Sequence, residues 1–74
     1  MTLEQAANIL KENWFKCFSI VNPEKYNVSV KEIIENNEMG AIVLAAIGKE
    51  NETPEYEEWF VHYNGHCVRN VPIE

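Results

Sequence analysis

The chain has 74 residues, of which 46% are apolar, and its net charge is −6, from twelve acidic and six basic side chains. This length allows one small domain, and this apolar content is typical of a folded protein and argues against intrinsic disorder. The negative charge disfavours direct binding to a phosphate backbone, so the composition argues against a nucleic-acid-binding role for the chain itself.

The first expected element is an amphipathic helix that runs from Thr2 to about Ile20 or Val21. Thr2 and Gln5 have the spacing of a capping box at its start. Apolar residues recur at three- and four-residue steps, which places them on one helix face. These residues are Leu3, Ala7, Leu10, Trp14, Cys17 and Val21. Pro23 ends the helix, because proline lacks the N–H donor and restricts the residue before it.

Residues 28–35 form the first expected strand, although this segment also fits a short helix. Ser29 and Glu32 are spaced as in a helix cap. Val28 and Val30, in contrast, alternate with polar residues as in a strand. The consecutive isoleucines at residues 33–34 suit a β-bulge. A strand is favoured because a turn rich in asparagine, with a glycine at its end, follows at once over residues 36–40.

The most informative segment is residues 41–47, AIVLAAI, in which seven apolar residues follow one another. A strand with one solvated face alternates apolar and polar residues, whereas an unbroken apolar run is typical of a strand buried on both faces. One helix covers only one face of a small sheet. The sequence therefore predicts that the other face is covered by the same chain, by a second copy or by a partner.

Residues 48–54 are polar and predict a loop, and residues 56–63 and 66–73 predict a second hairpin around Asn64-Gly65. A two-residue turn at this dipeptide sets the register. The face assigned to the core then carries Trp59, Val61, Tyr63, His66, Val68 and Asn70. The opposite face mixes aromatic, charged and polar groups, as a half-buried contact surface does, and carries Tyr56, Glu58, Phe60, His62, Cys67, Arg69 and Val71.

The expected fold class is α+β, with one N-terminal helix packed on a four-stranded antiparallel sheet in the order α-β-β-β-β, as a single domain over residues 1–74. The segments EIIENNEMGAIVLAAI (32–47) and EEWFVHYNGHCVRN (57–70) resemble the strand pairs of the cystatin-like superfamily, which includes nuclear-transport-factor-2-like domains. The resemblance implies a curved sheet on a helix, and often a dimer through the open face of the sheet. It implies no catalytic residue.

His62, His66 and Cys67 are candidate metal ligands, but the predicted register places His66 on the face opposite the other two. A zinc site needs three or four converging ligands. Cys67 and His62 would share a face as a thiol and a base, yet the sequence marks no orienting group and no oxyanion hole. We therefore expect no catalytic residue, no metal ion and no cofactor, and a protein that is not an enzyme.

Eight glutamates and only one base, Lys49, lie between residues 32 and 58, a net charge of −7 that fits a partner with a basic surface or simple solubility. We expect a small acidic protein–protein interaction module that forms a homodimer or docks on such a partner. One form of this hypothesis is an inhibitor, of the phage or mobile-element type, that occupies a nucleic-acid-binding groove on its target. The residues expected to contact the partner are Ile42, Leu44, Tyr56, Glu57, Glu58, Phe60, Glu38 and Glu55.

The alternative hypothesis is a cystatin-like domain that binds a small molecule between helix and sheet, near Trp14 and Trp59. No secretory signal pattern precedes the expected helix, and no segment has the length needed to span a membrane. The sequence therefore predicts a cytoplasmic protein with reduced cysteines and without a membrane partner.

Overall fold

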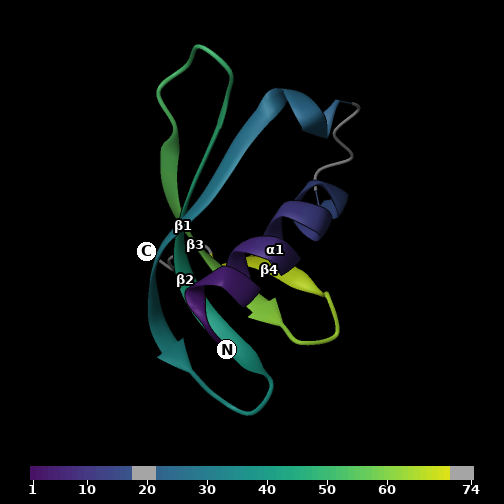
Figure 1. Cartoon of the computed structure of the whole chain (residues 1–74), viewed down its shortest axis with the longest axis vertical. Helices are drawn as coiled ribbons and strands as arrows, with labels where there is room; N and C mark the ends of the chain where they lie inside the picture. The colour runs from purple at the N-terminus through teal and green to yellow at the C-terminus, as the bar shows by residue number, and fades with distance from the viewer. Residues whose placement is uncertain (18–21, 71–74) are drawn as a thin grey trace.

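The computed structural model describes residues 1–17 and 22–70 (Figure 1). Its elements in chain order are α1 (Leu3–Asn13), the 3-10 turns η1 (Trp14–Cys17) and η2 (Pro23–Lys25), and the strands β1 (Tyr26–Asn36), β2 (Gly40–Lys49), β3 (Glu55–His62) and β4 (Cys67–Asn70). The strands lie in the order β1-β2-β3-β4, and all neighbours are antiparallel. The helix packs on one face of this sheet, which confirms the predicted α+β arrangement.

The helix begins as predicted, and its α-helical part ends earlier. The Thr2 side chain accepts a hydrogen bond from the Gln5 N–H at 3.1 Å, and the Thr2 N–H donates to Gln5 Oε1 at 2.9 Å. At the other end, Asn13 Nδ2 donates to the Ile9 carbonyl at 2.8 Å. Such side-chain bonds to the backbone compete with helix geometry, and α1 gives way here to the 3-10 turn η1. The part of the predicted helix over residues 18–21 lies outside the described residues.

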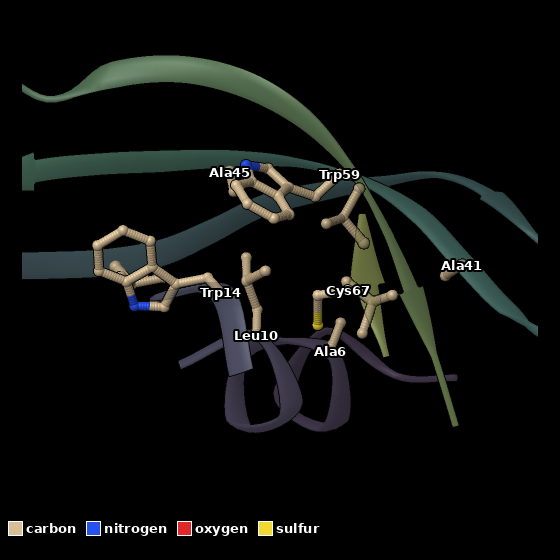
Figure 2. Packing of buried hydrophobic residues seen from close by; sticks show 10 residues of the cluster. Ala6, Leu10, Trp14, Ala41, Ala45, Trp59 and Cys67 are labelled. Atoms are coloured by element: carbon tan, nitrogen blue, oxygen red, sulfur yellow. The ribbon is translucent and has the colours of Figure 1, made fainter. Parts of the chain in front are cut away.

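The hydrophobic core lies between α1 and the sheet (Figure 2). On the helix side it consists of Ala6, Leu10 and Trp14, which are spaced four residues apart and therefore share one face. Leu3, which was expected on this face, is 46% exposed. The largest fully buried side chains are Trp59, Leu10, Val43 and Val61.

The segment that was ambiguous between helix and strand is strand β1, which begins two residues earlier than predicted. The ring of Tyr26, its first residue, packs on Trp14 with the ring centroids 5.1 Å apart. The pairing of β1 with β2 shifts twice, between Val30 and Glu32 and between Ile33 and Glu35. The second shift confirms the bulge that the paired isoleucines predicted.

The apolar run on β2 divides into two faces of different burial. Ala41, Val43 and Ala45 are fully buried under α1. Ile42 and Leu44 alternate with them, point to the opposite face and are half-buried. The run therefore has one dry face and one face that the described chain covers only in part.

The second hairpin forms, but its predicted register is wrong by one residue. Val61 pairs with Cys67 and not with Val68. A slip of one residue moves every side chain of a strand to the other face. Cys67 is therefore in the core and 3% exposed, whereas Val68 is 43% exposed, and Arg69 lies on the α1 face. Residues 71–73 of the predicted strand lie outside the described residues.

The register differs because the turn holds three residues, 63–65, and not two. The His62 N–H donates to the His66 carbonyl at 2.9 Å, and the Gly65 N–H donates to the His62 carbonyl at 3.0 Å. Gly65 has φ +93°, the left-handed conformation that closes a three-residue hairpin turn. Tyr63 and His66, which were expected in the core, are exposed.

Candidate interaction surface

The sheet face opposite α1, called the open face below, collects side chains from all four strands. The register assigns to it Ser29, Glu32 and Glu35 of β1, Ile42, Leu44 and Ala46 of β2, Tyr56, Glu58, Phe60 and His62 of β3, and Val68 and Asn70 of β4. The core cluster that includes the helix residues lies on the other side of the sheet. The open face is therefore the candidate site of the described chain.

An apolar row crosses the open face. Ile42 pairs with Phe60, and Phe60 pairs with Val68, so three apolar side chains lie side by side on three neighbouring strands. Leu44 follows on β2, and Tyr56, which is 62% exposed, extends the surface along β3. A solvated sheet face usually carries polar residues. A contiguous apolar surface at this position is typical of a contact site.

Carboxylates flank the apolar row. Leu44 pairs with Glu32 on one side and with Glu58 on the other. Ile42 has Glu35 as its partner on β1. All three glutamates are exposed. The open face therefore combines an apolar centre with negative charge.

Rings of three residues cluster where β3 meets its turn. The centroids of Phe60 and His62 are 4.3 Å apart, and those of His62 and His66 are 5.6 Å apart. The sulfur of Cys67 lies in the core, 3.9 Å from the Ile9 carbonyl oxygen. The structure thus separates Cys67 from His62, which the sequence placed on one face as a thiol and a base.

The observed register also changes which of the three candidate metal ligands are neighbours. His62 and His66 are neighbours, whereas the predicted register separated them, and Cys67 points away from both. Across residues 1–17 and 22–70, no group of three or more histidine, cysteine, aspartate or glutamate side chains is placed to hold a metal ion.

Five of the eight residues predicted to contact a partner share the open face; they are Ile42, Leu44, Tyr56, Glu58 and Phe60. The other three lie elsewhere. Glu38 is in the turn between β1 and β2, and Glu55 begins β3 opposite Ile47, a residue that packs on the core. Glu57 is on the α1 face. Sequence reasoning missed Val68, because its face depends on the length of the hairpin turn.

Glu57 has a structural role on the α1 face. Its Oε2 accepts a hydrogen bond from Trp59 Nε1 at 3.1 Å. The same oxygen lies 3.4 Å from Arg69 Nε, in an ion pair whose glutamate side chain is 17% exposed. Hydrogen bonds to charged groups are stronger than those between neutral groups. We therefore assign Glu57 to the support of the buried tryptophan and not to the contact surface.

The β1 edge of the sheet is poorly suited to pairing with a further strand. Strand β1 carries two register shifts, which interrupt its hydrogen-bonding edge. Bulges of this kind are a device by which proteins avoid association through a sheet edge. The open face is therefore a better candidate for association than the β1 edge.

Surface clefts lie beside Trp14, and one of them is also lined by Ile47 and Glu57 on the sheet face that α1 covers. One has a volume of about 330 Å³ and the other about 300 Å³, and Trp14 and Tyr26 line both. The space between α1 and the sheet itself is filled, because Trp59 and Leu10 are fully buried there. A small molecule that enters between Leu10 and Trp59 would have to displace this packing.

Comparison with known proteins gives no further guide to function. No protein-family model matches the chain, and neither a curated protein nor a solved structure shows a significant match. The resemblance to cystatin-like domains therefore stays a prediction. Among the described elements, no helix has the length and apolar character needed to cross a membrane.

Proposed function

We propose that the chain is a small non-enzymatic interaction protein that docks on a protein partner through its open face. The observation that supports this proposal is the apolar row of Ile42, Phe60 and Val68, continued by Leu44, on the face that α1 does not cover. A domain of this size buries only about 60% of the surface that its unfolded chain exposes. Association through the open face adds apolar burial to this small core.

The charge supports a partner with a basic surface. Residues 32–58 carry a net charge of −7, and Glu32, Glu35 and Glu58 place part of it on the open face itself. Complementary charges steer association and suppress wrong partners. Proteins that bind nucleic acid offer basic surfaces of this kind. An inhibitor that occupies such a surface is the sharper form of the proposal.

The change of Leu44 to glutamine is expected to weaken partner binding about tenfold or more, because it removes an apolar anchor from the centre of the contact. The chain is used as bait in an extract of its source cells, co-purified proteins are identified, and the purified partner is then titrated. Leu3→Gln is the matched control, since it makes the same chemical change at an exposed position of α1.

Both variants are first shown to fold by circular dichroism. Equal retention of one partner by Leu44→Gln and Leu3→Gln would contradict docking through the open face. Salt and duplex DNA are added to the same titration. Both weaken binding if the partner surface also binds nucleic acid, and indifference to both removes the inhibitor hypothesis.

A further inference from the structure

One of the carboxylates that flank the apolar row, Glu58, has apolar neighbours on two strands. Glu58 is exposed, and the register places it between Leu44 of β2 and Asn70 of β4. Its neighbours on the same face of β3 are Tyr56 and Phe60, because alternate residues of a strand share a face. Across the described residues, the carboxylate of Glu58 has neither a hydrogen-bond partner nor an ion-pair partner.

Among the described residues, no lysine or arginine forms an ion pair with Glu58. Arg69 is on the α1 face and pairs with Glu57. Lys31 is at the first bulge of β1, and strand β2 separates β1 from β3. A cation that pairs with Glu58 in a complex is therefore best supplied by the partner.

We propose that Glu58 makes the open face selective for a protein segment in which apolar side chains surround a lysine or arginine. This inference rests on the proposed function. Covering a carboxylate without a compensating group is unfavourable, whereas a charge-assisted hydrogen bond to a cation offsets its loss of water. The lysine or arginine of the partner supplies that bond beside the apolar row, where Leu44, Tyr56 and Phe60 help to exclude solvent.

The same carboxylate disfavours a second copy of the chain as the occupant. In a two-fold dimer each partner presents the same patch to the other. A face-to-face dimer would bring Glu58, Glu32 and Glu35 of both copies into one contact. Like charges at an interface suppress association. The homodimer expected from the sequence is therefore the less favoured occupant, and a basic partner is the better fit.

Sedimentation of three forms of the full chain tests the effect on self-association. The unaltered chain is expected to stay a monomer at millimolar concentration. Glu58→Leu is expected to dimerise at a concentration at least about tenfold lower, which corresponds to roughly 1.4 kcal/mol. Glu52→Leu, the same change in the exposed β2–β3 loop, should behave as the unaltered chain. A dimer of the unaltered chain, or a monomeric Glu58→Leu variant, would overturn the inference.

Binding of synthetic peptides tests the selectivity. The probes are soluble peptides with apolar residues around one central lysine, glutamine or glutamate, and amide NMR spectra follow the titration. The lysine peptide should bind through the open face, and Glu58→Gln should weaken it about tenfold, as the loss of one charge-assisted hydrogen bond predicts. Glu52→Gln makes the same change in net charge and should change affinity less than about twofold.

The outcomes separate the two proposals. Glu58→Gln and Glu52→Gln of equal affinity would overturn the role of Glu58, and so would a glutamine or glutamate peptide that binds as well as the lysine peptide. In either case, if Leu44→Gln abolishes binding of the lysine peptide, docking through the open face is still supported. If no peptide binds, the role of Glu58 is rejected. The partner titration with Leu44→Gln and Leu3→Gln then decides the proposed function by itself.

Discussion

Trp59→Ala is expected to lower the free energy of unfolding by about 3–5 kcal/mol, the largest effect of any side-chain truncation in this chain. The Trp59 side chain is fully buried at the centre of the core beside Leu10 (Figure 2), and its indole N–H donates to Glu57. Truncation leaves a cavity and removes that bond. Because natural domains have only about 5–15 kcal/mol of stability in total, this loss is a large fraction of the stability.

Urea denaturation followed by circular dichroism measures this loss. The matched control is Tyr56→Ala, which removes an aromatic side chain from the same strand on the opposite face, where it is 62% exposed. The control should cost less than about 1 kcal/mol. Similar losses for the two variants would show that the core does not lie where the structure places it.

The second large effect is expected for Gly40→Ala, at about 3 kcal/mol or more. A Cβ atom at Gly40 would overlap the carbonyl oxygen of Val61 and would lie 2.8 Å from the Cα of His62. Both are backbone atoms of the neighbouring strand β3, so no side-chain rotation relieves the overlap. Strands β2 and β3 would have to move apart next to the buried pair Ala41 and Val61.

Gly65→Ala is the control for this prediction, because an alanine there is strained by its backbone conformation and not by a close neighbouring strand. A Cβ atom at Gly65 would have its nearest neighbour at 3.5 Å, in the Asn13 side chain, so there is room for it. The cost comes from φ +93° alone and should be about 1–2 kcal/mol. Equal losses for the two variants, measured by thermal denaturation, would contradict the close approach at Gly40.

The α+β arrangement could be predicted because each local signal agreed with it. The capping box at Thr2, the turn before Gly40 and the apolar run of β2 marked their elements independently. The register of the second hairpin could not be predicted in the same way. Asn64-Gly65 fits a two-residue turn with both residues at positive φ, and it also fits the end of a three-residue turn. In this turn Gly65 has positive φ and Asn64 does not.

The composition of the open face was predictable in part. The alternation of β2 places Ile42 and Leu44 on one face whatever the register. Glu57 and Glu58 are consecutive in a strand and must point to opposite faces. The sequence alone therefore shows that only one of them can lie on the open face. Glu57 lies two residues before the buried Trp59 and therefore shares its face. Which residues of β1 lie on the open face depends on two bulges. The placement of Glu32 and Glu35 on this face therefore became clear only from the structure.

The central claim is that the open face of the isolated chain is wet at its apolar centre and becomes dry only when a partner binds. The most direct measurement is the relaxation of methyl NMR signals by a neutral, soluble paramagnetic chelate. Ile42 and Leu44 report on the open face, and Val43, which lies between them on β2 and is fully buried, is the internal reference.

In the isolated chain, the methyl signals of Ile42 and Leu44 should relax strongly while those of Val43 stay protected, and dilution should not change the ratio. Addition of the basic partner should protect Ile42 and Leu44 as well. Methyl groups of Ile42 and Leu44 that are as protected as those of Val43 in the dilute chain alone would contradict a solvent-exposed apolar centre on the open face.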